Sequence, residues 1–245
     1  MKRIEINSFQ DFIRIVEDST LTETDLTYPK KRIVLFRGQN NNYKLLPAIA
    51  RNDSSKNTKD KEVIILEELR LRSFGIIEDK ELKDDWDWLV FAQHFGLHTR
   101  LLDWSSNPLV ALFFACSDYS KIKVDSYVYM FIGGEEFLVD KKKDNSPFEI
   151  NATKILRPKP NNKRIVAQSG WFTVHRYSQK DKRFVNIESH GGFKDLVFEI
   201  KIPSNRKETF MEILNKMGIN FQSLFPDEEG LCRQINWENR PLSEH

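Results

Sequence analysis

Cysteine is scarce in this chain of 245 residues, where only Cys116 and Cys232 occur. Two cysteines are too few for a disulfide framework or a cysteine-rich zinc site. The chain also lacks any apolar run near the ~20 residues of a membrane helix, and no signal-peptide core follows its first residues. We therefore expect a cytoplasmic protein without a membrane partner.

An excess of charge of one sign is also missing. Thirty-eight basic residues stand against 36 acidic ones, so the formal net charge is +2. A protein that coats DNA normally carries a strong basic excess, so nucleic acid is a disfavoured partner. The basic residues of 154–183 alternate with Trp171, Phe172 and Tyr177, which leaves a nucleic-acid binder or processing enzyme as one alternative.

What is present is ordinary globular composition, with 40% hydrophobic residues and 18 phenylalanines to fill a core. No repeat or low-complexity linker divides the chain. We predict one α+β domain at 29–236, preceded by a helix and loop at 1–28 and followed by a tail at 237–245. In this domain N-terminal helices would pack on a mostly antiparallel C-terminal sheet.

Hydrophobic periodicity and turn residues predict the individual elements. The expected helices are 9–16, 63–74, 85–95, 108–117, 205–218 and 226–234, and the expected strands are 33–36, 127–132, 164–167, 172–175 and 196–202. Loops are expected at 19–30, 52–60, 141–147 and 158–162. The segment 108–117 is apolar on all sides, which predicts a buried helix at the centre of the core.

Arg37 is the first candidate functional residue, because it ends an apolar strand and precedes Gly38 and Gln39. A guanidinium offers a fixed fork of donors that suits a phosphate or a carboxylate. Gly38 allows another backbone or a ligand to approach closely. A structural arginine paired with an internal carboxylate is the other interpretation, and these residues alone do not separate the two.

The second candidate is the segment 93–107, which is dense in polar residues between two apolar helices. Buried polar groups are costly unless they pair with each other or with a ligand. The segment ends at Asn107, where the free N–H groups of the buried helix attract anions. We predict a phosphate between Arg37 and this helix terminus.

Other side chains of that segment have two interpretations each. Asp103 is either a carboxylate base or an anchor for Arg100 and the loop, and Trp104 is either a stacking wall or a core residue. His94 and His98 lie on both sides of a helix-breaking glycine, and no third ligand has a diagnostic spacing, so we expect no metal. No P-loop, GxGxxG or Ser-His-Asp order supports an NTPase, Rossmann or hydrolase function.

Two later segments also contain candidate functional residues. The segment 164–175 contributes Gln168 and His175, and the segment 225–231 contributes acidic residues. Those acids begin a short expected helix, where negative charge also favours the helix dipole.

Taken together, these motifs resemble the FRG domain family, which is named for an aromatic-Arg-Gly motif, here Phe36-Arg37-Gly38. The longest signature resembles the stretches 92–97, 99–104 and 107–115, and further strings match within 167–175 and 224–231. Phe95 stands where a second His is usual, and His98 where Pro is usual. Family members occur in bacteria and phages, so the resemblance implies a bacterial protein.

A weaker similarity links the chain to toxin-like ADP-ribosyltransferases. In that class an aromatic-Arg-Gly strand end binds the phosphates of NAD, and a Pro-x-Val-Ala helix follows, which the stretch 108–115 resembles. The similarity implies a split sheet and an NAD cofactor. The turn that supplies their catalytic Glu has Arg164 and Gln168 here, and a guanidinium cannot stabilise the cation that forms as nicotinamide leaves.

The similarity implies a set of site residues for an ADP-ribosyltransferase or NAD glycohydrolase acting in bacterial defence or toxicity. The expected catalytic residues are His94, Asp103, Gln168 and Glu229, and the expected cofactor-binding residues are Arg37, Gly38, Gln39, Arg100, Trp104, Ser105, Asn107, Phe172 and His175. The alternative is a non-catalytic module that senses a nucleotide-type ligand, with a protein partner or antitoxin as a further expected partner. The missing Glu favours that alternative.

Overall fold

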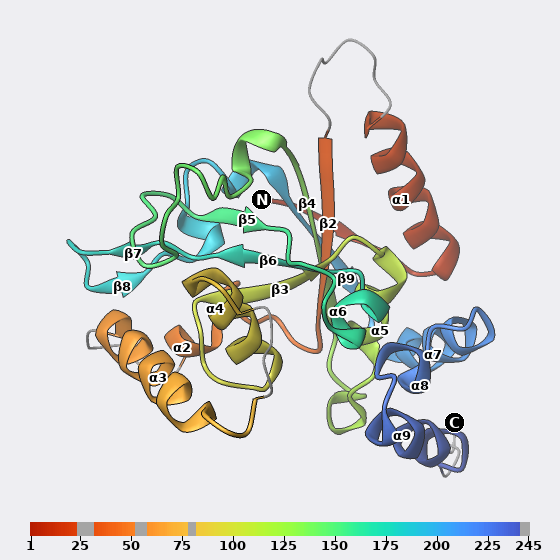
Figure 1. Cartoon of the computed structure of the whole chain (residues 1–245). Helices are drawn as coiled ribbons and strands as arrows, with labels where there is room; N and C mark the ends of the chain where they lie inside the picture. Colours follow the sequence, from red (N-terminus) through yellow and green to blue (C-terminus); the bar gives the residue numbers. More distant parts are fainter. Residues whose placement is uncertain (24–31, 52–57, 78–81, 241–245) are drawn as a thin grey trace.

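The computed structural model describes residues 1–23, 32–51, 58–77 and 82–240 (Figure 1). Its centre is a seven-stranded sheet with the strand order β1-β9-β4-β2-β3-β6-β5. β1 and β9 are parallel, whereas the other neighbours in this sheet are antiparallel. The prediction of an α+β fold with a mostly antiparallel sheet is therefore confirmed.

The strands of this sheet come from both halves of the chain. They are β1 (Lys2–Glu5), β2 (Arg32–Gln39), β3 (Leu101–Ser105), β4 (Ser126–Gly134), β5 (Lys154–Leu156), β6 (Gly170–Val174) and β9 (Val197–Ile202). A separate ribbon pairs β7 (Tyr177–Ser178) with β8 (Arg183–Phe184). The helices are α1 (Phe9–Glu23), α2 (Ala48–Arg51), α3 (Thr58–Ser73), α4 (Asp85–His94), α5 (Pro108–Cys116), α6 (Lys163–Ala167), α7 (Lys207–Lys216), α8 (Phe221–Leu224) and α9 (Glu228–Glu238).

The sheet divides into two halves between β2 and β3. β2 pairs with β4 along its whole length, but it pairs with β3 only where Phe36 faces Ser105. Beyond that pair the strands diverge, so β1, β9, β4 and β2 form one half and β3, β6 and β5 form the other (Figure 1). An opening is therefore left beside the ends of β2 and β3.

Helix α5 packs on the first half as the predicted buried core helix. Val110, Leu112 and Phe113 are almost fully buried, and α7 and α8 cover the outer side of the helix, where Phe113 meets Phe221 with ring centroids 4.9 Å apart. Gly38 of β2 touches α5 directly, because a Cβ atom at this position would lie 1.9 Å from the carbonyl oxygen of Ala111. Close backbone contact therefore requires glycine here.

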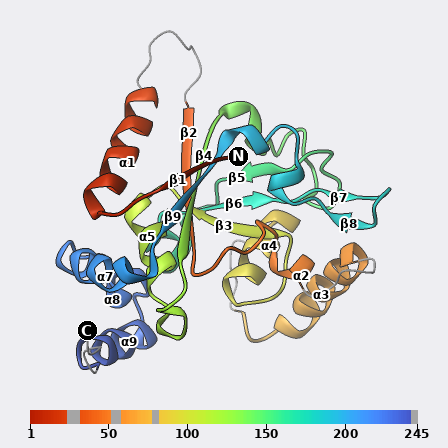
Figure 2. The ribbon, with the colours of Figure 1, turned by 180° about the vertical axis from the view of Figure 1, so that it is seen from behind.

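Helices α2, α3 and α4 gather beside the second half of the sheet, as the view from behind also shows (Figure 2). Trp86 and Leu89 of α4 pack with Phe172 of β6 in one apolar cluster. The buried carboxylate of Glu62 on α3 accepts hydrogen bonds from the main-chain N–H and the Nε of Arg100, at 2.7 and 2.8 Å. This buried pair ties α3 to the start of β3.

Some elements differ from the sequence prediction. Residues 164–167 form helix α6 instead of a strand, because Asn162 caps the main-chain N–H of Arg164 and Val166 faces solvent. β1, β3 and β5 of this sheet were not predicted. β1 and β5 are short strands at its edges, whereas β3 lies inside the sheet between β2 and β6. α1 continues to Glu23 and α3 begins at Thr58, while the rest of the loops expected at 19–30 and 52–60 lies largely outside the described residues.

Across the described ranges, none of the helices has the length and apolar character that crossing a bilayer requires.

Candidate functional site

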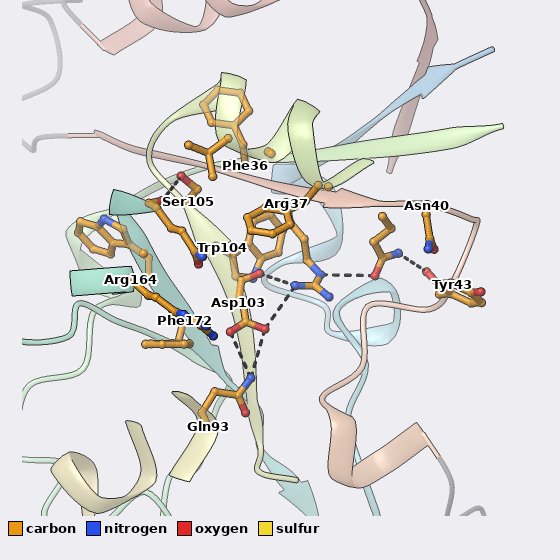
Figure 3. Close-up of a pocket in the computed structure, with 18 of the residues that line it drawn as sticks. Phe36, Arg37, Asn40, Tyr43, Gln93, Asp103, Trp104, Ser105, Arg164 and Phe172 are labelled. Carbon is orange, nitrogen blue, oxygen red and sulfur yellow. Dashed lines mark hydrogen bonds and ion pairs between the residues drawn. The ribbon is translucent and has the colours of Figure 1, made fainter. Parts of the chain in front are cut away.

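A cavity of about 970 Å³ lies where the two halves of the sheet diverge (Figure 3). Its walls come from β2 and the loop after it, from the end of α4, from β3, from α5 and from the α6–β6 turn. The segments 36–39 and 93–105, which are far apart in the sequence, therefore meet at one site.

Arg37 lies in the opening between β2 and β3. If the pairing continued past Phe36 and Ser105, the main chain of Gly38 would face that of Asp103. Instead the strands separate, and Nη1 of Arg37 donates a 2.7 Å hydrogen bond to the main-chain carbonyl of Asp103. The guanidinium thus satisfies a carbonyl that the split removes from the β2–β3 ladder.

The Arg37 side chain is only 13% exposed, and its Nε donates to the Gln39 side chain at 3.4 Å. Burial lowers the pKa of Arg37 to about 10, while the nearby Asp103 carboxylate acts in the opposite direction. The group therefore remains charged at neutral pH. Among the described residues, Nη2 of this guanidinium has no hydrogen-bond partner, which leaves a donor for a ligand.

Asp103 presents its carboxylate to the cavity, with 60% of the side chain exposed and Oδ2 3.8 Å from Nη1 of Arg37. Nε2 of Gln93 lies 3.2 Å from both carboxylate oxygens. The other end of the Gln93 amide is fixed, because its Oε1 accepts a 2.7 Å hydrogen bond from Thr99. Gln93 therefore orients Asp103 (Figure 3).

Sequence reasoning placed Gln93 in a functional segment but not among the site residues. The signal available was its position as the penultimate residue of α4, next to His94. The contact with Asp103 joins residues ten positions apart, and only the return of the chain along β3 brings it about.

Several predicted site residues do line the cavity. They are Arg37, Gly38, Gln39, His94, Asp103, Trp104, Ser105, Gln168 and Phe172. Some of their polar groups are already engaged within the protein: Nε1 of Trp104 donates to Thr173 at 3.0 Å, and Nε2 of Gln168 donates to the carbonyl of Leu224 at 3.1 Å. Burial lowers the pKa of His94, and the charge of Arg164 lowers it further.

Three predicted cofactor-binding residues lie outside the cavity lining. Arg100 is fully buried in its pair with Glu62, and its Nη1 donates to the carbonyl of Pro147 at 2.7 Å. His175 is fully buried against the carbonyl of Val185, and burial lowers its pKa to about 4, so it is neutral. Both side chains are part of the interior.

Asn107 is the third, and its side chain caps α5 by accepting a 2.9 Å hydrogen bond from the main-chain N–H of Leu109. The side of α5 that faces the cavity carries Val110, Ala111 and Phe114. The interpretation that a phosphate lies between Arg37 and the N-terminus of α5 does not fit this geometry, because that terminus is capped and off the cavity.

Glu229, a predicted catalytic residue, also lies outside the cavity lining. Its carboxylate is 3.1 Å from Nη2 of Arg164 and 3.5 Å from Nη1 of Arg233, and its side chain is 61% exposed. Arg164 is held in addition by Asp227, the N-cap of α9, at 2.7 Å. Arg164 itself does line the cavity, on the side opposite Tyr43 in Figure 3.

Positive charge dominates the walls. Arg37, Lys44, Arg51, Lys121 and Arg164 line the cavity, whereas the acidic side chains there are Asp103 and Asp118. A partly enclosed site with this balance attracts anions. Within the described residues, no group of three or more His, Cys, Asp or Glu side chains is arranged to hold a metal ion.

The fold and the cavity define an α+β domain with an arginine-centred, electropositive cleft in a divided sheet. The FRG domain family model matches residues 32–123, which run from the start of β2 past α5 and include Arg37, Gln93 and Asp103. This match supports assignment to the FRG family. Neither the curated proteins nor the solved structures gave a match to the chain.

Proposed function

We propose that the cleft binds a phosphorylated nucleotide-type ligand, with NAD as the first candidate, and that Arg37 is its central anion contact. The observation that carries this proposal is the buried, charged guanidinium of Arg37, which has a free donor facing a cavity of about 970 Å³. Ligand pockets for small molecules and cofactors span about 300–1,000 Å³, so a dinucleotide fits this space.

The chemistry that fits the cleft best is ADP-ribosyl transfer or NAD hydrolysis. In either reaction the bond between nicotinamide and ribose breaks, the bonding electrons leave with nicotinamide, and positive charge develops at the ribose carbon. A carboxylate beside that carbon stabilises the charge. Asp103 supplies this group, and the oxygen of water or of an acceptor hydroxyl then forms the new bond and loses its proton to solvent.

Asp103 suits this role better than the other lining acid. Both carboxylate oxygens of Asp118 accept internal hydrogen bonds, one from the main chain and hydroxyl of Ser120 and the other from Asn40. Asp103, by contrast, is exposed to the cavity and is oriented by Gln93. Such an activity would suit the role in bacterial defence or toxicity that the family resemblance implies.

The second candidate function is ligand sensing without turnover. It is favoured by α6 and the turn after it, which present Arg164 and Gln168 in place of an acid, both already engaged with neighbouring groups. In this case Arg37 still binds the anion, and Asp103 has a purely structural role beside it.

A calorimetric titration with NAD, combined with a nicotinamide-release assay, tests these functions. We expect Arg37→Ala to weaken NAD binding at least tenfold and Asp103→Asn to bind NAD but release no nicotinamide. Arg14→Ala, at an exposed position on α1, is the matched control and should behave as wild type. Binding with chemically unchanged NAD supports sensing, whereas no binding at millimolar NAD removes both NAD functions.

A further inference from the structure

Three cations of the cleft have no role in the proposed contact at Arg37. Lys44 and Arg51 lie in the segment that follows β2, and Lys121 lies in the short 3₁₀ turn Tyr119–Lys121 after α5. None of the three forms an ion pair with a carboxylate among the described residues, although ion pairs are frequent elsewhere on this surface.

The backbone that carries Lys44 and Arg51 is well anchored. Leu45 and Ile49 are buried between them, and Nε of Arg51 donates to the carbonyl of Leu46 at 3.1 Å. The side chain of Gln39 holds the same loop by donating to the carbonyl of Tyr43 at 2.8 Å. These charges are therefore displayed from a fixed wall of the cleft.

The opposite wall meets this loop through a hydrogen bond between Asn40 and Asp118. That contact brings the turn bearing Lys121 next to the end of β2. Nζ of Lys207 donates to the carbonyl of Lys121 at 2.7 Å and so holds the turn in place. Asp118 stays an ionised carboxylate while it accepts hydrogen bonds from Asn40 and Ser120, so it offsets only part of the positive charge of the cluster.

One of these cations, Arg51, also lies close enough to Arg37 to interact with it. The charge of Arg51 lowers the pKa of Arg37, in addition to the larger effect of burial. The cations of the cleft outnumber its acidic side chains and repel each other, and a bound anion reduces that repulsion.

We propose that Lys44, Arg51 and Lys121 form a second anion subsite, so that the preferred ligand carries a phosphate in addition to the diphosphate held at Arg37. This inference rests on the proposed function and narrows its substrate class to a dinucleotide with an extra phosphate monoester, of which NADP is the available example.

NAD and NADP differ by one phosphate, which makes them a direct test by calorimetric titration. We expect wild-type protein to bind NADP at least tenfold more tightly than NAD. The double variant Lys44→Glu/Arg51→Glu should lose this preference and bind the two ligands equally. The control Arg14→Glu/Lys142→Glu makes the same charge change at exposed positions outside the cleft and should keep the preference.

Should the charge-reversal variant fail to fold, Lys44→Gln/Arg51→Gln removes the same charges with less repulsion and should reduce the preference at least threefold. Equal binding of NAD and NADP to wild type would overturn the inference and leave the proposed function intact. A preference that survives both double variants would also overturn it.

Absence of binding by either dinucleotide would instead count against the proposed function. The subsite is then tested by titrating wild type and the variants with inorganic pyrophosphate. Pyrophosphate binding that disappears in Lys44→Gln/Arg51→Gln and persists in the control supports the subsite. No pyrophosphate binding to wild type overturns it.

Discussion

Arg37 and Asp103 are joined by a 2.7 Å hydrogen bond from the guanidinium to a main-chain carbonyl, across the opening between two diverging strands. Their side chains lie near each other as well, with 3.8 Å between Nη1 and Oδ2. The contact keeps a cation and a carboxylate side by side without closing the cleft. Both charges therefore remain accessible to a ligand that has an anionic part and a part that becomes cationic.

Replacing Glu229 should show that the acid of this site is Asp103. Because Glu229 lies outside the cavity in a pair with Arg164, we expect Glu229→Gln to keep at least half of the wild-type rate of nicotinamide release. Asp103→Asn should lower that rate at least a hundredfold with little change in NAD affinity. Equal losses in the two variants, measured at saturating NAD, would contradict this assignment.

Gly38 should tolerate no side chain. A methyl group there would lie 1.9 Å from the carbonyl oxygen of Ala111, so β2 and α5 would have to move apart. We expect Gly38→Ala to lower the free energy of unfolding by roughly 3 kcal/mol, as overpacked cores do. Gly191→Ala is the matched control, since a methyl group there meets nothing within 4 Å, and urea unfolding should place it near wild type.

The Glu62–Arg100 pair should be essential for stability but not for ligand binding. Both side chains are 1% exposed, so removing one partner leaves a buried charge without compensation. We expect Glu62→Ala to cost about 3–5 kcal/mol in urea unfolding. Glu68→Ala, which breaks the exposed pair with Arg72, should cost less than about 1 kcal/mol. Similar costs for the two variants would show that the buried pair is unimportant.

His175 should make folding sensitive to acid. Burial lowers its pKa in the folded protein to about 4, below its usual value of 6.5, so the unfolded chain takes up the proton first as pH falls. The contribution of this group to stability is complete above pH 6.5 and is lost progressively towards pH 4, with a total of roughly 3 kcal/mol.

His175→Gln should remove this part of the pH dependence. Urea unfolding of wild type and variant between pH 4 and pH 7.5 measures it, since carboxylates common to both proteins cancel in the difference. A difference between the two proteins that stays constant across this range would contradict the prediction.

The sequence indicated helix α5 and its cap well, because local patterns decide them. Asn107 followed by Pro108 starts a helix by local hydrogen bonding, and an entirely apolar helix has to be buried. Strands β4 and β9 were also predicted from local patterns, namely hydrophobic periodicity and turn residues. In contrast, the segment 164–167 was predicted as a strand although it belongs to helix α6, since five helical residues hold too little periodicity to reveal a capped turn of helix.

The sequence by itself indicated that Arg37 lies near the end of a strand, that Asp103 follows an apolar helix and that both belong to candidate functional segments, because strand ends and polar segments are visible locally. Tertiary structure alone decided which polar residues meet. The divergence of β2 and β3 opened the cleft, the pairing with Glu62 took Arg100 into the core, and the ion pair with Arg164 kept Glu229 outside. Those outcomes depend on contacts between residues that are separated by 38 to 66 positions in the sequence. Such long-range contacts produce no periodic pattern in the sequence.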